Sequence, residues 1–209
     1  MFFKTLPASA QRIFAQLGGE SSVRSFYLAG GSACALHLGH RISVDLDFFT
    51  PEMYEPAQLI PRLESIGKIT VQQQSRGTFV GLLAETQVSF FYYGYPLLTP
   101  PQIWRGVRIA SLRDIALMKI TAISQRGRKR DFVDLYFICR EQQLGLSDLL
   151  KQIPDKYPTL SYPSYHLLRA LTFFDDAEKD APPKMLARYN WQQVKRFFEK
   201  QSATLMQEL

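Results

Sequence analysis

The sequence has few of the residues that build disulfide frameworks, zinc sites or membrane spans. Cysteine occurs only at Cys34 and Cys139 among 209 residues, and the three histidines do not combine with these into a zinc-ligand spacing. We therefore expect reduced thiols and no zinc site. No apolar run approaches the roughly 18–20 residues that a membrane helix needs, and the apolar start at Met1 is too short for a signal peptide. These absences predict a cytoplasmic protein that does not enter a membrane.

Acidic residues are scarce in one part of the chain. Residues 105–140 hold nine basic and three acidic residues, so their net charge equals the +6 of the whole protein. Local positive charge is typical of surfaces that bind nucleotide phosphates or RNA. Charge alone favours the simpler interpretation of a solvated basic surface, so a polyanionic partner needs support from elsewhere in the sequence.

The hydrophobic patterns predict an α/β (α+β) fold, with a mixed β-sheet flanked by helices and then a helical C-terminal region. Hydrophobic residues make up 46% of the chain, which excludes a disordered protein. The predicted strands are residues 25–29, 42–49, 68–74, 78–83, 87–93 and 106–110. The predicted helices are residues 6–17, 33–38, 56–66, 112–124, 131–142, 147–152, 165–174 and 191–206. We place the division near Trp104, with a core at residues 1–104 and a helical region at residues 105–209 packed on it.

Two aspartates share one face of the predicted strand at residues 42–49. Because side chains alternate across a strand, Asp45 and Asp47 lie on the same side, about 7 Å apart by strand rise. Such carboxylates repel each other unless a cation lies between them. Mg²⁺ is held by a few carboxylates together with substrate phosphates, and paired ions serve phosphoryl and nucleotidyl displacement. The pattern predicts a magnesium site, although Asp-x-Asp alone is equally common on a solvated strand edge.

A Gly-Gly-Ser sequence precedes this strand by about a dozen residues. Gly30, Gly31 and Ser32 fall between a predicted strand and a predicted helix. Glycine lets the backbone approach a phosphate closely, and a helix N-terminus offers free N–H donors to it. Ser32 can add a hydroxyl donor. Gly-Gly-Ser alone is most often a simple turn, but its conjunction with Asp-x-Asp predicts a nucleotide site.

These segments resemble the nucleotidyl transferase AbiEii/AbiGii toxin family, within the DNA polymerase β-like nucleotidyltransferases. The similarity lies in LAGGSA at residues 28–33 and HRISVDLDFF at residues 40–49. It continues in VSFFY at residues 88–92, LMKI at residues 117–120 and RKRDFVDLY at residues 128–136. Together these segments span roughly residues 25–140.

The resemblance implies a nucleotidyltransferase core and an activity. It implies magnesium-dependent transfer of a nucleoside monophosphate from a nucleoside triphosphate to an acceptor, either RNA such as tRNA or protein. It also implies the toxin of a toxin–antitoxin pair, with a cognate antitoxin as partner. The glycines and Ser32 would hold the triphosphate, Asp45 and Asp47 the metal. Lys119 matches a phosphate-binding lysine, and Asp131 matches the aspartate of the last motif.

Several of these residues have a simpler structural interpretation. Lys119 shares a helix face with apolar residues, so it either contacts phosphate or extends its amine out of an apolar stripe. Asp131 is either catalytic or merely favourable at a helix N-terminus, and the nearby Asp134 is better explained as structural. Arg41 contacts phosphate or closes the turn before the strand.

One position departs from the wider superfamily. Members of that superfamily usually carry a third carboxylate on a later strand, which commonly helps to deprotonate the attacking hydroxyl. In this sequence Ser89 stands in that place. An alternative is therefore a catalytically degenerate protein of the same fold that binds nucleotide or a partner without turnover. A structural α/β domain that only binds RNA is a third reading, which leaves the carboxylate pair unexplained.

Overall fold

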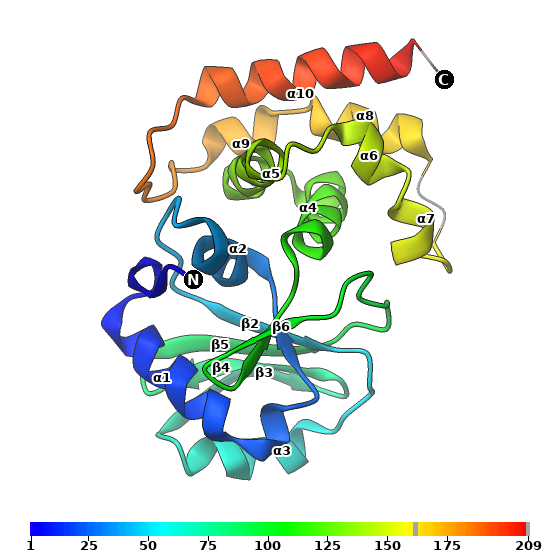
Figure 1. Ribbon diagram of the computed structural model, residues 1–209. Coiled ribbons are helices and arrows are strands. Elements are labelled where there is room, and N and C mark those ends of the chain that lie inside the picture. Colours follow the sequence, from blue (N-terminus) through cyan, green and yellow to red (C-terminus); the bar gives the residue numbers. More distant parts are fainter. Residues whose placement is uncertain (161–162, 208–209) are drawn as a thin grey trace.

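The centre of the protein is a seven-stranded mixed β-sheet. A computed structural model describes residues 1–160 and 163–207 (Figure 1). The strands are β1 (Tyr27–Leu28), β2 (Leu46–Thr50), β3 (Ile69–Ser75), β4 (Thr78–Leu83), β5 (Thr86–Tyr92), β6 (Gln102–Trp104) and β7 (Val107–Ile109). Their spatial order is β3-β4-β5-β2-β1-β7-β6. This order places β2 in the middle of the sheet.

Helices cover both faces of the sheet and form a further layer on one side. They are α1 (Ala8–Gly19), α2 (Gly30–Leu38), α3 (Pro56–Glu64), α4 (Leu112–Arg126), α5 (Lys129–Glu141), α6 (Leu146–Leu150), α7 (Ile153–Lys156), α8 (Ser164–Leu171), α9 (Asp175–Lys179) and α10 (Trp191–Met206). Short 3₁₀ turns occur at Phe3–Thr5 and Ser21–Val23. In Figure 1, α1 and α3 lie against one face, and α2, α4 and α5 lie over the other. Helices α8, α9 and α10 lie outside that second layer.

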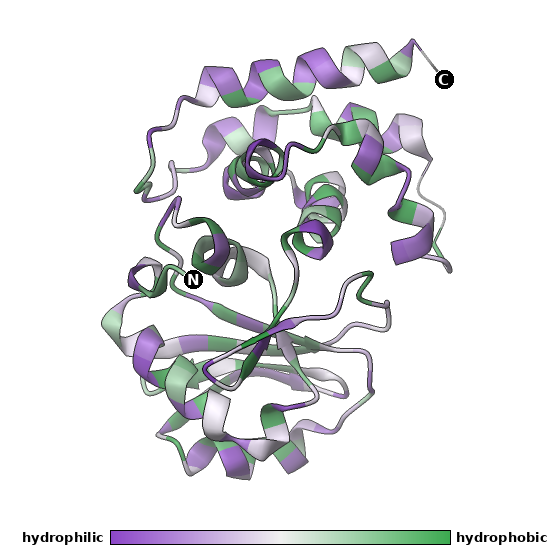
Figure 2. Cartoon of the chain, viewed as in Figure 1, coloured by the Kyte–Doolittle hydropathy of each residue, from purple (hydrophilic) through white to green (hydrophobic). Residues whose placement is uncertain are grey.

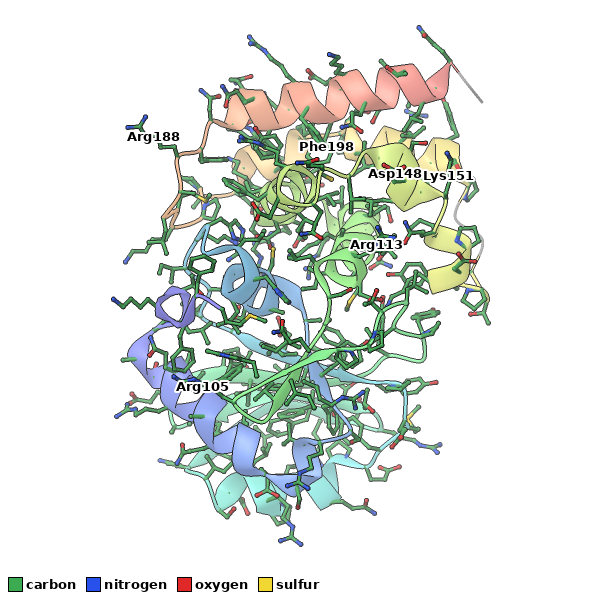
Figure 3. The ribbon with its side chains drawn as sticks, in the orientation of Figure 1. Arg105, Arg113, Asp148, Lys151, Arg188 and Phe198 are labelled. Atoms are coloured by element: carbon green, nitrogen blue, oxygen red, sulfur yellow. The ribbon has the colours of Figure 1, made fainter. Side chains whose placement is uncertain are left out.

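The outer helices are held by an aromatic core. Phe198 is completely buried, and Figure 3 shows it pointing from α10 toward the helices beneath. Its ring lies 5.5 Å from the ring of Phe132 in α5, in the edge-to-face arrangement that aromatic pairs prefer. Purple and green alternate along α10 in Figure 2, as expected for a helix with one face covered. The C-terminal helices therefore pack firmly on α5.

The central strand runs parallel to β5 and antiparallel to β1. Asp47 of β2 stands opposite Ser89 of β5, and Phe48 stands opposite Leu28 of β1. The short strand β1 ends immediately before α2. The Gly-Gly-Ser segment follows β1, and the Asp-x-Asp segment overlaps the start of β2. Because β1 and β2 are neighbours, the two segments meet at the same end of these strands.

The predicted class, a mixed sheet flanked by helices with a helical C-terminal region, is confirmed. The ranges predicted for β4 and α10 agree with the structure residue for residue. Ser111 caps α4, because its hydroxyl accepts a hydrogen bond from the Asp114 amide at 3.0 Å. The division near Trp104 stays a prediction; along the chain, β7 still belongs to the sheet and α4 begins at Leu112.

The strand predicted at residues 42–49 is wrong in its first half. β2 begins only at Leu46, because the preceding backbone bonds elsewhere. The Ile42 amide donates to the Lys184 carbonyl, and the Ser43 amide donates to the Thr5 carbonyl. Val44, expected to share the face of Leu46, is 54% exposed. The chain before β2 is thus a loop anchored to two distant segments.

Four further differences concern the start of α2 and three short elements that the sequence does not predict. Gly30 to Ser32 form the first turn of α2 rather than a separate turn before it. β6, α7 and α9 have only three to five residues each. Elements of this length contain too little periodicity for a sequence pattern to reveal them.

Candidate active site

A cavity of about 570 Å³ opens between the sheet and the helices α4 and α5. One part is polar and is lined by Gly30, Gly31, Arg41, Ser43, Asp45, Asp47, Lys119, Arg130 and Asp131. The other part is aromatic and is lined by Phe49, Phe91, Tyr92, Tyr93, Tyr95 and Tyr157. A volume of this size suits a small-molecule ligand with one charged and one apolar end.

The two aspartates lie together in the polar part. Asp45 comes directly before β2, and Asp47 is its second residue. Burial and the nearby charge of Asp45 raise the pKa of Asp47, while a hydrogen bond from Ser89 partly opposes that rise. The Arg130 guanidinium is 3.9 Å from the nearer Asp45 oxygen, which is too far for a hydrogen bond. The carboxylate pair therefore carries negative charge that is only loosely compensated.

The glycines allow the two motifs to touch. Gly30 has φ +66°, a left-handed conformation that favours glycine, and a methyl group there would lie 3.2 Å from Asp47 Oδ2. A methyl group on Gly31 would come within 2.5 Å of Arg41 Nη2. The start of α2 is therefore in direct contact with both Asp47 and Arg41.

Ser32 has a different position from its neighbours. Its side chain is 1% exposed, and its hydroxyl donates a short hydrogen bond to the Asp45 main-chain carbonyl. This hydroxyl connects the Gly-Gly-Ser segment to the Asp-x-Asp segment. Unlike Gly30 and Gly31, Ser32 does not line the described cavity.

A buried ion network lies behind the polar part of the cavity. Lys119 of α4 places its amine 2.6 Å from Asp131 Oδ1 and 2.7 Å from Asp134 Oδ2. Asp134 also accepts two hydrogen bonds from Arg41, at 2.6 and 2.8 Å, and lies 2.8 Å from His40 Nε2. Asp131 and Asp134 are completely buried. The network joins α4, α5 and the loop before β2 into one rigid unit.

The charges in this network fix its protonation state. Burial would raise the pKa of Asp134, but Arg41 and Lys119 outweigh burial and hold that pKa well below its usual range. Burial would lower the pKa of Lys119, and Asp131 and Asp134 together raise it instead. Both partners are thus charged, which is the condition under which buried ions are tolerated.

Cys34, His40 and Asp134 bring one ligand atom each to within 4.8 Å of one another. They do not fit a metal ion. The Asp134 carboxylate is already shared by Arg41, Lys119 and His40, and a further cation would meet two fixed positive charges. Burial raises the pKa of the Cys34 thiol well above its usual value, whereas metal binding requires a thiolate.

The aromatic part of the cavity is closed by a chain of hydroxyl groups. The hydroxyls of Tyr93 and Tyr157 are 2.7 Å apart, and Thr121 Oγ1 is 3.1 Å from Tyr157. The Tyr95 ring packs edge-on against Tyr157 at 4.9 Å. Flat apolar rings with a few hydroxyls at one end offer a stacking surface for a planar ligand.

The sequence model of the nucleotidyl transferase AbiEii toxin family, of type IV toxin–antitoxin systems, matches residues 96–204. That match covers more than half of the 209 residues. The chain belongs to the AbiEii nucleotidyl transferase family. The resemblance predicted from the sequence is therefore confirmed, and the protein is a transferase of this class.

Two kinds of relative accompany this AbiEii assignment. The uncharacterized protein aq_aa25 of Aquifex aeolicus (strain VF5) is 36% identical over 179 residues, which cover 84% of this chain and 85% of that protein. A proposed nucleotidyltransferase from H. pylori has a similar structure, with a TM-score of 0.52 at 15% identity over 96% of this chain and 92% of that one. The antibiotic-resistance factor ANT(2'')-Ia has a TM-score of 0.53 at 14% identity, over 69% of this chain and 90% of that one. The two structures show a shared fold.

The AbiEii match begins after the two glycine and aspartate motifs and includes Lys119 and Asp131. Within the described part of this AbiEii-family chain, no helix is both long and apolar enough to span a membrane.

Sequence reasoning missed the aromatic residues of the cavity, including Tyr93 and Tyr157. Those two are 64 positions apart and meet only in the folded protein. Their one signal in the sequence is an unusually tyrosine-rich stretch at residues 92–95.

Proposed function

We propose that this AbiEii-family protein uses Mg²⁺ to transfer a nucleoside monophosphate from a nucleoside triphosphate to an RNA acceptor. The observation that carries the proposal is the meeting of Asp45 and Asp47 with Gly30, Gly31 and Arg41 at one end of a single cavity. We infer that it acts as the toxin of a cytoplasmic toxin–antitoxin pair. The family supports that role, together with a cognate antitoxin as partner.

The carboxylate pair fits a magnesium site. Asp45 and Asp47 are hard oxygen ligands that line one cavity, and the pKa of Asp47 is raised by burial and by the nearby charge of Asp45, both of which a cation would offset. When bound, magnesium would activate the attacking hydroxyl and stabilise the charge of the departing pyrophosphate. Ser89 donates a hydrogen bond to Asp47 and thereby orients that carboxylate, at the position where the resemblance to the wider superfamily implies a third acid.

The chain's own groups can hold the triphosphate beside this pair. The first turn of α2 presents free backbone amides, and glycine at positions 30 and 31 removes the side chains that would block a phosphate. Arg41 lines the same end of the cavity with its guanidinium held in place by Asp134. The nucleobase would then stack in the aromatic part, against Tyr93.

The buried network changes the roles first expected for Lys119 and Asp131, and a separate hydrogen bond changes that of Ser32. Because the Lys119 amine is bound to both Asp131 and Asp134, we assign it to positioning rather than to direct phosphate contact. Asp131, completely buried beneath Lys119 and Arg126, holds those cations and is not free to accept a proton. Ser32 fixes Asp45 through its main-chain carbonyl.

In the proposed reaction, an acceptor hydroxyl attacks the α-phosphorus of the nucleotide. A bond forms between the acceptor oxygen and that phosphorus, and the bond to the bridging oxygen breaks. Pyrophosphate leaves with that oxygen, and the proton of the hydroxyl passes to a base. The cavity contributes orientation, since Asp45, Asp47 and Arg41 all approach from the same wall.

Two measurements test this function. Calorimetry with each nucleoside triphosphate should show binding that requires magnesium and disappears with a chelator. A transfer assay with α-labelled nucleotide should then move label to RNA in a reaction that Asp47→Asn abolishes. Magnesium-dependent binding without transfer would establish the alternative, a degenerate binding protein with Ser89 in place of the missing acid. No binding of any nucleotide would overturn the assignment of the site.

A further inference from the structure

A second cavity, of about 470 Å³, lies on the outer side of α4 and is not used by the proposed reaction. Helix α8 forms most of it, through Tyr165, His166, Arg169, Ala170 and the following Thr172 and Phe173. Ser124 of α4 completes the lining. It is a wide surface hollow between two packed helices.

Its side chains combine exposed rings with positive charge. Tyr165 and Phe173 are 57% and 54% exposed, which is unusual for large aromatic residues. The Arg169 guanidinium lies 5.8 Å from the centre of the Tyr165 ring, a cation–π distance. Arg169 and His166 are both exposed, and the lining, among the residues that the structure describes, contains no acid. The chemistry is that of a surface on which unpaired bases stack while cations contact the phosphates.

The second cavity adjoins the first at the end of α4. There, Ser124 lines the second cavity, whereas its neighbours Gln125 and Arg126 line the first. A strand that enters the first cavity would therefore reach the exposed rings by crossing the end of α4.

We propose that this second cavity binds unpaired bases of the RNA acceptor, by stacking on Tyr165 and Phe173 with Arg169 on the phosphate backbone. The inference rests on the proposed function, because it supplies the acceptor side of the same reaction. RNA is favoured over an acidic peptide because two exposed rings offer flat stacking surfaces, which a peptide carboxylate does not use. The site binds single strands, since bases in a duplex are not available to stack on protein rings.

The test is the binding of a fluorescent single-stranded RNA of roughly 12 nucleotides to the full protein, measured by anisotropy. Tyr165→Ala and Phe173→Ala should each weaken binding by about tenfold, the usual effect of losing one stacked base. Tyr165→Phe keeps the ring and should bind like the original protein. Phe2→Ala is the matched control, because Phe2 is a 55% exposed ring near the N-terminus that lines neither of the two described cavities.

Salt dependence separates stacking from charge. Arg169→Ala should reduce the slope of log affinity against log salt by about 0.7, the value for one phosphate contact on a single strand. Tyr165→Ala should weaken binding without changing this slope. A duplex of the same sequence should bind at least tenfold more weakly than the single strand, by the loss of stacking.

The outcomes distinguish this inference from the proposed function. Nucleotide binding by calorimetry should be the same in Tyr165→Ala, Phe173→Ala and the original protein, because these rings lie outside the first cavity. If nucleotide binds normally and the ring variants bind RNA like the original, the second cavity is not the acceptor site. If an acidic peptide of equal charge displaces the RNA equally well, the surface recognises charge alone and the proposal is overturned.

Discussion

Gly31 lies directly against the Arg41 guanidinium, so that a methyl group on Gly31 would come within 2.5 Å of Arg41 Nη2. That guanidinium is itself held by two hydrogen bonds to Asp134 in the buried network. Arg41 therefore links the first turn of α2 to Asp134 in the helical region. A side chain at position 31 would therefore displace Arg41 and disturb the ion network.

Gly31→Ala should destabilise the protein, because Arg41 must give up part of its pairing with Asp134. Losing one hydrogen bond between charged groups costs about 1.5–3 kcal/mol. Urea unfolding of the apo protein measures this change. The control is Gly19→Ala, since a methyl group on Gly19 has no neighbour within 4 Å and its effect should stay within about 0.5 kcal/mol. Equal stabilities of the two variants would contradict the contact between Gly31 and Arg41.

Asp134→Asn should be strongly destabilising, by about 3–5 kcal/mol, because it leaves Arg41 and Lys119 buried without their shared counter-charge. Asp155→Asn is the matched control, since Asp155 is exposed on α7. A loss below about 1 kcal/mol, as surface ion pairs give, would show that the network does not hold the helical region.

Asp134 should also make the stability of the protein depend on pH. The folded pKa of Asp134 is depressed, so its stabilising contribution is fully present above the unfolded pKa of about 3.9. That contribution is lost progressively as pH falls from there toward the lower folded pKa. The stability difference between the original protein and Asp134→Asn should therefore be constant near pH 7 and shrink in acid. A stability difference that increased as the pH fell would contradict this prediction.

Asp47→Asn should abolish nucleotide transfer without harming the fold. The raised pKa of Asp47 means that its charge disfavours the folded state at neutral pH, and this penalty fades as pH falls through the folded pKa. In chelator at pH 7, the variant's melting temperature should equal or slightly exceed that of the original. Asp45→Asn should also abolish transfer. A clear loss of stability in both variants with transfer intact would remove the carboxylates from the reaction.

Ser32→Ala should lower the stability of the apo protein by about 1–3 kcal/mol, the cost of an unpaired buried acceptor at the Asp45 carbonyl. A hydroxyl that served only to bind phosphate would leave apo stability unchanged and weaken nucleotide binding alone. Thermal unfolding and calorimetry on the same sample separate the two roles. Ser65→Ala provides the comparison, because the Ser65 hydroxyl makes an exposed hydrogen bond to the Arg62 carbonyl.

The part of the site that local patterns encode could be predicted from the sequence. Asp47 and the glycines belong to two short segments whose strands are neighbours, so turn chemistry and strand order are enough to bring them together. Asp45 lies beside them although it precedes β2, outside the strand on which the alternation argument relied. Asp134 was correctly interpreted as structural. Its partner Arg41, however, is 93 positions away, and no periodicity links two residues across that distance.

The sequence also does not show which charges of the basic segment at residues 105–140 are paired in the folded protein. Arg128 and Lys129 both bond to Asp180, at 3.0 and 2.9 Å, and Arg126 bonds to Asp131. Only the folded protein shows that much of this charge is paired locally, while Arg130 faces the cavity. That the segment contacts RNA phosphate stays a prediction. Arg130→Ala should lower the salt slope of RNA binding by about 0.7, and Arg128→Ala should leave it unchanged.

The loop before β2 is held by the far end of the chain. The His40 carbonyl accepts hydrogen bonds from the Leu186 and Ala187 amides, and the Ile42 amide donates to the Lys184 carbonyl. Residues 184–187 come more than 140 positions after this loop, so part of its backbone anchoring is made only when the chain has been synthesised as far as residue 187. Aspartates 45 and 47 leave the ribosome long before their surroundings are complete. A nascent chain that ends before residue 184 therefore lacks part of the backbone that anchors the loop next to these two aspartates.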